Sequence, residues 1–154
     1  MRRIGWGMVM LAILFFVAVC PVMAEPMDDA KALVDKTLAF IKANGLEKAV
    51  AEINGNPKGQ LSKGELYVVI QDFSGLILAH GGNPKLAGQN HWDVKDPSGK
   101  FFVREQVETA KTKSGGGLVD LVWTNPATKK VQPKTNFVKR IEGKNVMVMS
   151  GIFG

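Results

Sequence analysis

The segment from residue 80 to residue 105 constrains the fold more than any other. Glycines and prolines interrupt it repeatedly, and both histidines of the chain lie in it. Such residues break regular structure and fix unusual backbone angles. An apolar run, residues 76–79, leads into the segment, and a helical pattern begins at Phe101. A long loop with aromatic and polar side chains between a strand and a helix is typically a binding loop. The sequence therefore predicts the lid of a small-molecule pocket.

The first 24 residues have the pattern of a secretory signal peptide. Arg2 and Arg3 give a positive start, residues 5–19 form an uncharged apolar run, and Ala24 follows other small or apolar residues. These are the three parts of a signal that is removed after export. The sequence predicts cleavage after Ala24, a single mature domain at residues 25–154, and a periplasmic or secreted location.

An uncleaved membrane anchor and a lipid-modified Cys20 are the alternatives for this segment. The apolar run is shorter than the ~20 residues that a spanning helix needs. Val19 precedes Cys20, whereas lipoprotein signals usually carry Gly, Ala or Ser before the modified cysteine. Since Cys20 is the only cysteine, the mature domain would hold no disulfide, which suits a bacterial periplasm better than a disulfide-rich extracellular module.

The charge of the predicted mature domain is mildly basic and evenly spread. Without Arg2 and Arg3, 18 basic and 14 acidic residues remain, so the formal net charge falls from +6 to +4. The basic residues lie in scattered pairs along the chain, not in a dense stripe interleaved with aromatic residues. This pattern indicates a solvated surface and no nucleic-acid partner.

Hydrophobic periodicity predicts a chain of the α+β class. Residues 28–43 and 46–53 have the three- and four-residue spacing of helices, and Asn44-Gly45 separates them. A further helix is predicted at residues 102–111. The expected strands are residues 66–70, 76–79, 118–123, 131–141 and 146–153. Short turns between sequential strands predict one antiparallel sheet of about five strands, covered by helices on one side.

Several motifs occur in an order that resembles a known family. They are His80…Asn83-Pro84…Gly88, Asp96-Pro97…Gly99-Lys100…Phe102, Gly115-Gly116-Gly117…Trp123…Asn125-Pro126…Lys134…Val138-Lys139-Arg140 and Ser150-Gly151-Ile152. Across most of residues 30–153 their order and spacing are similar to those of the single cache domain of the second type. This resemblance implies a PAS-like fold with a long N-terminal helix and a curved sheet that holds a small ligand. Such domains are extracytoplasmic sensors of chemoreceptors and histidine kinases, usually for small organic acids, amino acids or related metabolites.

The chain departs from this family in two respects. Most members continue into a transmembrane helix and a signalling domain, whereas here Gly154 follows the last predicted strand. The expectation is a stand-alone domain that presents its loaded state to a membrane histidine kinase or chemoreceptor. Leu121, Val122 and Phe137 stand where relatives often carry tyrosines that bind a ligand, which predicts a different ligand, or weakened or lost binding.

Three polar side chains are predicted to bind the ligand. His80 matches a family position near the pocket and could donate to a carboxylate, or it could cap the loop backbone instead. Arg104 suits bidentate carboxylate capture, unless it lies on the outward face of its helix. Lys134 matches a lysine typical of the family, and strand alternation prevents it from sharing a face with Phe137.

Trp92, Phe101 and Trp123 are predicted to enclose the ligand with their aromatic rings. Trp123 could equally be a core residue, which is the commoner fate of a large aromatic side chain. His91 could join His80 in binding a metal, but no helical two-histidine spacing or cysteine pair supports such a site. The sequence therefore predicts no metal and no cofactor.

Catalysis finds no support in the sequence. Ser150 and the histidines lack a nucleophile elbow or triad-like setting, and Gly115–Gly117 begins a strand and not a phosphate-binding helix. Two functions remain. The first is a periplasmic sensor domain for a small metabolite, with a short organic acid as the expected ligand. The second is a protein-interaction module with a degenerate pocket that docks a partner or forms a homodimer.

Overall fold

The computed structural model describes residues 26–154, and the predicted signal peptide at residues 1–24 lies outside this range. Three helices are present: α1 (Pro26–Asn44), α2 (Leu46–Gly55) and α3 (Phe102–Ala110). The strands are β1 (Ser62–Lys63), β2 (Leu66–Tyr67), β3 (Val69–Asp72), β4 (Ile77–His80), β5 (Gly116–Thr124), β6 (Val131–Arg140) and β7 (Val146–Phe153), and a short 3-10 helix, η1, covers Pro84–Leu86. Within residues 26–154, no helix has both the length and the apolar character needed to cross a membrane.

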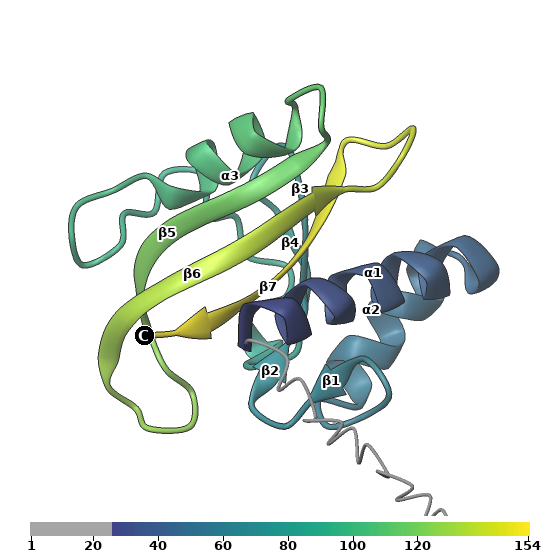
Figure 1. Ribbon diagram of the computed structural model, residues 1–154, viewed down its shortest axis with the longest axis horizontal. Helices are drawn as coiled ribbons and strands as arrows, with labels where there is room; N and C mark the ends of the chain where they lie inside the picture. The colour runs from purple at the N-terminus through teal and green to yellow at the C-terminus, as the bar shows by residue number, and fades with distance from the viewer. Residues whose placement is uncertain (1–25) are drawn as a thin grey trace, which may run out of the picture.

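A five-stranded antiparallel sheet in the order β4-β3-β7-β6-β5 forms the centre of the molecule. The last strand of the chain, β7, lies between β3 and β6 and is therefore the central strand of the sheet (Figure 1). β5, β6 and β7 are long and joined by short turns, whereas β3 and β4 are short. The predicted α+β class, with a long N-terminal helix and a five-stranded antiparallel sheet, is confirmed.

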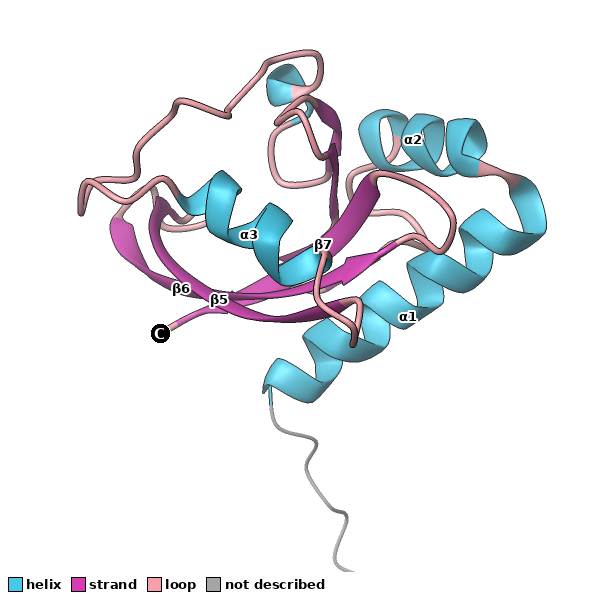
Figure 2. Cartoon of the chain, turned by 90° about the horizontal axis from the view of Figure 1, so that it is seen from above, coloured by secondary structure: helices cyan, strands magenta, loops and turns pink. Residues whose placement is uncertain are grey.

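Helices cover both faces of the sheet, so the expectation of helices on one side only is wrong. Figure 2 shows α1 on one side of the strands and α3 on the other. The face under α1 and α2 is called the helix-covered face, and it contains Ile70 and Val148. The opposite face, under α3 and the loop 81–101, is called the cavity face. Each long strand supplies both faces because successive side chains point to opposite sides of a sheet.

The long helix α1 forms because its apolar side chains recur at helical spacing. Leu33, Val34 and Ile41 are buried against the sheet, and Thr37 on the same stripe satisfies its hydroxyl by donating to the Leu33 carbonyl at 2.8 Å. Gly45, with φ of +91°, ends the helix in a backbone conformation that glycine adopts without strain. The periodicity of the sequence therefore places α1 correctly.

The predicted strand at residues 66–70 is divided in the structure. Residues 66–67 form β2, which pairs with β1 in a separate two-stranded ribbon, and residues 69–72 form β3 in the main sheet. Ser150 Oγ donates to the Tyr67 carbonyl at 2.8 Å, and the Gly81 N–H donates to the Val68 carbonyl at 2.9 Å. These contacts satisfy the backbone where the chain leaves one ladder for the other.

Candidate functional site

The loop 81–101 is fastened to both edge strands of the sheet. Near its beginning, the Gly88 N–H donates to the Ile77 carbonyl at 2.8 Å, on the outer edge of β4. Near its end, the carboxylate of Asp96 is buried and accepts from the backbone N–H groups of Lys100 and Val122, both at 2.9 Å. The second contact ties the loop to the edge strand β5. The loop therefore spans the cavity face as a fixed cover.

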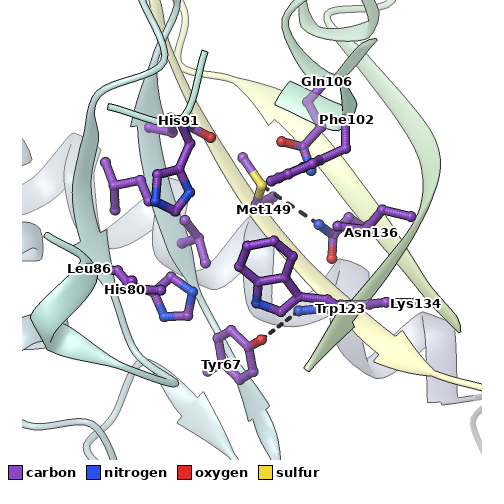
Figure 3. Close-up of a pocket in the computed structure, with 14 residues that line it drawn as sticks. Tyr67, His80, Leu86, His91, Phe102, Gln106, Trp123, Lys134, Asn136 and Met149 are labelled. Carbon is purple, nitrogen blue, oxygen red and sulfur yellow. Dashed lines mark hydrogen bonds between the residues drawn. The ribbon is translucent and has the colours of Figure 1, made fainter. Parts of the chain in front are cut away.

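A cavity of about 40 Å³ lies between this loop, α3 and the sheet (Figure 3). Its apolar walls come from strands, from α3 and from the loop, and they include Ile77, Leu86, Phe102, Leu121, Trp123 and Met149. The polar side chains that line it gather in two groups. Figure 3 shows Tyr67, His80 and Lys134 at one end of the cavity, and His91, Gln106 and Asn136 at the other.

Lys134 is the central group of the first end. It lies on β6, its side chain points to the cavity face, and only 5% of the residue is exposed. Its Nζ donates to the hydroxyl oxygen of Tyr67 at 2.7 Å and stands 4.2 Å from the centroid of the same ring. Phe153 on β7 offers a second ring at 4.8 Å. These contacts hold the amine where water cannot surround it.

His80 completes this group by stacking on Tyr67, with the ring centroids 5.2 Å apart. Its Nδ1 accepts from the Asn83 N–H at 2.9 Å, so Nδ1 carries no proton. In the neutral ring the proton is then on Nε2, which makes that nitrogen a donor. The sequence left open whether His80 faces a pocket or caps the loop, and the structure shows that it does both.

Burial shifts the ionisation of all three groups toward their neutral forms. It lowers the pKa of Lys134 to about 7 and raises the pKa of Tyr67 above its ordinary value. The pKa of His80 falls to about 4, chiefly because of burial and next because of the neighbouring charge of Lys134. In the described part of the chain, no carboxylate lines the cavity. This end therefore holds a buried amine without a counter-ion.

The other end of the cavity is polar but carries no fixed charge. Gln106 on α3 and Asn136 on β6 are buried, and their side-chain oxygens have no hydrogen-bond partner among residues 26–154. His91 Nε2 lies 3.3 Å from the Gln89 Oε1 atom. Buried amide groups ordinarily find partners, so unpartnered ones beside a cavity are suited to contact a bound molecule.

A wider cavity of about 520 Å³ adjoins the first at its cationic end. The two share Tyr67, His80, Leu86 and Trp123. Lys85 and Lys129 also line the wider cavity, and no acidic residue of the described chain does so. A small anion approaching the inner cavity through this outer space would therefore meet positive charge first.

The structure brings together three of the six predicted site residues. His80, Trp123 and Lys134 line the inner cavity, whereas Trp92, Phe101 and Arg104 do not. Arg104 pairs with Asp93 at 2.5 Å, and its guanidinium lies 4.0 Å from the Phe101 ring centroid. It also donates from Nε to the Trp92 carbonyl at 3.3 Å. These three residues form a cluster outside the cavity.

Strand alternation resolves the position of Lys134 relative to Phe137. Lys134, Asn136 and Val138 face the cavity side of β6, while Phe137 packs against the helix-covered face. Phe137 does not line the cavity, as expected for a residue three positions from Lys134 on a strand whose side chains alternate between the two faces.

Tyr67, like Gln106 and Asn136, is a polar cavity residue that the sequence did not predict. It was expected inside a regular strand, where nothing distinguished its side chain from its neighbours. It is the only tyrosine of the chain, and the family resemblance pointed to ligand-binding tyrosines only in later strands, where this chain has Leu121, Val122 and Phe137. A lone tyrosine shortly before the glycine-rich loop is the signal that could have found it. Among residues 26–154, no three histidine, cysteine or acidic side chains gather as a metal site would require.

The family described as Single Cache domain 2 matches residues 27–153, which is nearly the whole of the described chain. Among curated proteins, the sensor histidine kinase MctS of Rhizobium johnstonii is 30% identical over 87 residues, covering 56% of this chain and 18% of MctS. The methyl-accepting chemotaxis protein McpP of Pseudomonas putida is 26% identical over 87 residues, covering 56% of this chain and 16% of McpP. The match therefore spans less than a fifth of each curated relative.

Solved structures of sensor domains share the fold. A methyl-accepting chemotaxis protein from Vibrio parahaemolyticus has a TM-score of 0.68 at 18% identity, covering 82% of this chain and 87% of its own. The periplasmic sensor domain of a chemotaxis protein has a TM-score of 0.63 at 26% identity, covering 82% and 88%. A Cache chemosensory domain, solved to explain its carboxylic acid recognition, has a TM-score of 0.61 at 26% identity, covering 82% and 86%.

Proposed function

The chain belongs to the single Cache domain 2 family, and from this premise we propose that it is an extracytoplasmic sensor domain that binds a short carboxylate in its inner cavity. Members of the family serve as the sensor domains of chemotaxis receptors and histidine kinases, and one structural relative recognises a carboxylic acid. The identity of the ligand is argued from this chain's own side chains.

Lys134 is the observation that carries the proposal. A buried amine without a carboxylate partner is costly to keep, because burial disfavours its charged form. A bound carboxylate would supply the missing counter-ion. Within the described chain the amine faces a cavity in place of an acidic side chain, so the structure leaves room for that counter-ion to come from solution.

The neighbours of Lys134 favour an anion with acceptor atoms only. The Tyr67 oxygen accepts from Lys134, which leaves its own hydroxyl proton free to be donated. His80 presents an Nε2–H group in its neutral tautomer. Three donors on neighbouring side chains match the two oxygens of a carboxylate, which accept up to about four hydrogen bonds.

The size of the cavity favours a short ligand. Its volume of about 40 Å³ is small beside the roughly 300–1,000 Å³ of sites for drug-sized ligands. Behind the cationic end, Ile77, Phe102 and Met149 form an apolar wall. An acid of two or three carbons would place its carboxylate against Lys134 and its carbon chain against this wall.

A thermal-shift screen tests the proposal. The purified protein is heated with acetate, propionate, pyruvate or lactate, with acetamide and propionamide as uncharged controls. An acid at 100 times its Kd should stabilise the protein by about 2.7 kcal/mol, a rise of several degrees in Tm for a domain of this size. The amides should give no comparable rise, because they cannot pair with the Lys134 charge.

Two variants distinguish binding in the inner cavity from binding at the protein surface. Lys134→Met should abolish the response to the acid, whereas Lys139→Met should preserve it. Lys139 lies on the same strand, but it is exposed and pairs with Asp35 at 2.8 Å on the outside of the protein. Silence of the wild-type protein across all the acids would contradict the proposal and favour the interaction-module alternative.

Export and signalling follow from the same proposal. We propose that residues 1–24 are removed as a signal peptide and that residues 25–154 act in the periplasm, which N-terminal sequencing of the exported protein would test. A membrane histidine kinase or chemoreceptor is the proposed partner, because the curated relatives are proteins of these two kinds. The stand-alone co-receptor role and the possible homodimer stay predictions.

A further inference from the structure

We propose that carboxylate binding at Lys134 is coupled to the uptake of one proton from solvent, so that the sensor reports acidity together with ligand concentration. This inference rests on the proposed function and adds a regulation to the same site. Its basis is the set of groups that surround Lys134 and the effect that a bound anion would have on the protonation of this amine.

Among residues 26–154, no side-chain carboxylate pairs with Lys134, and the rings of Tyr67 and Phe153, 4.2 and 4.8 Å from its Nζ, attract an ammonium only weakly. Phe153 of β7 contributes only a ring, and Asp120 of β5 points to the opposite face, where it accepts from Thr135 at 2.6 Å. Asp120 and the last residue, Gly154, line a separate cavity that Lys134 also borders. The titratable and charged groups that line the inner cavity and the wider cavity beside it are Tyr67 of β2, His80 of β4, Lys85 and His91 of the loop 81–101, and Lys129 of the β5–β6 turn. In the described chain, this set is neutral or positive and contains no carboxylate.

The empty site therefore favours a neutral amine over an ammonium. Burial lowers the pKa of Lys134 to about 7, so above neutral pH most molecules carry the uncharged amine. The Tyr67 hydroxyl stays protonated, since burial raises its pKa above the ordinary value. His80 is neutral, because its pKa is about 4. Around pH 8 the whole cationic end is thus uncharged and hydrogen-bonded.

A carboxylate in the cavity reverses this preference. An anion beside a buried amine favours the ammonium and raises the pKa of the amine toward or above its usual range. Short carboxylic acids are already ionised at neutral pH, so the ligand brings no proton. Tyr67 and His80 keep theirs. The balance is one neutral amine, one carboxylate and one proton from solvent, giving one ammonium–carboxylate pair.

Because ligand binding is coupled to protonation of Lys134, the proton uptake and the Kd should both depend on pH in a defined way. Uptake should be about 0.1 proton per ligand at pH 6, about 0.5 at pH 7 and about 0.9 at pH 8, following the fraction of neutral Lys134 in the empty protein. Affinity should be nearly constant below pH 6 and fall about tenfold per pH unit above pH 8. Between pH 6 and pH 8.5 the Kd should rise about 30-fold.

Isothermal titration calorimetry measures this uptake directly. The probe is whichever of acetate, propionate, pyruvate or lactate gives the largest thermal shift, titrated at pH 8 into the protein in HEPES and in Tris buffer. These buffers release different heats on ionisation, so the difference in observed enthalpy yields the number of protons taken up. A value near one, together with the loss of affinity at higher pH, supports the proposal. Binding with no proton uptake and a constant Kd overturns it while leaving the proposed function intact.

The variant Lys134→Arg isolates the responsible group. An arginine stays charged throughout this pH range, so binding to the variant should proceed without proton uptake and with a Kd that no longer depends on pH. Persistence of the wild-type uptake in this variant would contradict the assignment to Lys134. If the arginine does not fit the cavity, the wild-type titration still decides. Absence of binding by every acid would overturn the proposed function and this inference together.

Discussion

The two faces of the central sheet are built from the same strands but have opposite interiors. On the helix-covered face, Ile70 and Val148 pack with Leu33 and Val34 of α1 in an apolar core. Thr37 is buried there too, and its hydroxyl is satisfied within its own helix. The cavity face is formed by the alternate residues of the same strands together with α3. Its buried polar side chains surround the inner cavity: Gln71, His80, Gln106, Lys134 and Asn136.

The helix-covered face therefore determines stability, and the cavity face determines function. Burying polar groups without partners destabilises the folded state, whereas close apolar packing stabilises it. A chain under selection for stability alone would fill the cavity face as it fills the other. The helix-covered face supports the sheet, and the cavity face keeps the ionisable amine of Lys134 beside a cavity and away from water.

The largest effect should come from truncating the helix-covered face. Ile70→Ala removes a side chain with no exposed surface and should lower the free energy of unfolding by about 2–5 kcal/mol. Ile77→Ala removes a similar side chain that already borders the cavity, so it has fewer packing contacts to lose and should cost less. Chemical denaturation of both variants checks the comparison. Equal losses would show that the two faces are equally packed.

Lys134→Met should make the empty protein more stable and should alter its pH dependence. The folded pKa of Lys134, about 7, lies below that of an exposed lysine, so the unfolded chain binds more protons between these values and wild-type stability rises with pH there. The advantage of the methionine variant should therefore shrink by about 2.5 kcal/mol from pH 6 to pH 9. Denaturation at both pH values checks this. A constant difference would mean that Lys134 titrates normally.

His80 should give a smaller pH effect on the acid side. Its folded pKa of about 4 is below the unfolded value of about 6.5, so the stability that it contributes is lost as the pH falls through this window. The loss attributable to His80 should be about 1.5 kcal/mol between pH 6.5 and pH 5. In His80→Gln this part of the pH dependence should vanish, and an unchanged profile would argue against a buried neutral ring.

The smallest effect is expected from Arg104→Ala. Arg104 pairs with Asp93 on the outside of the loop, and exposed ion pairs contribute about 0–1 kcal/mol. Because Arg104 does not line the cavity, ligand affinity should stay within about twofold of wild type, unlike Lys134→Met. Calorimetry on the two variants checks this. Loss of binding in Arg104→Ala would place the ligand on the aromatic cluster of the loop instead.

Much of the fold could be predicted because its periodicity is local. The apolar stripe of α1, the helix α3 and the three long C-terminal strands follow from patterns within each segment. The two-sided arrangement of helices could not be predicted, since α3 shows an apolar stripe without showing which face of the sheet it covers. The break at Val68 also escaped prediction, because it depends on contacts of the backbone with Ser150 and Gly81, which are distant in sequence.

The site was predictable only in part, for the same physical reason. Lys134 and His80 could be found because a motif marked them, and strand parity placed Phe137 on the other face. Arg104 has suitable chemistry for a carboxylate, but the direction of a side chain on a short helix depends on the loop that packs against it. Tyr67 meets Lys134 across 67 positions of the sequence, and no local pattern contains such a contact.

The most direct measurement of the central claim is the pKa of Lys134 itself, with and without a ligand. NMR of protein labelled with 13C at the lysine ε-carbon would follow its titration, and the resonance absent from Lys134→Met would assign it. We expect a pKa of about 7 in the ligand-free protein and a rise of at least about two units with the bound acid. An ordinary lysine pKa that the acid does not change would contradict the claim that the cavity face is a carboxylate site.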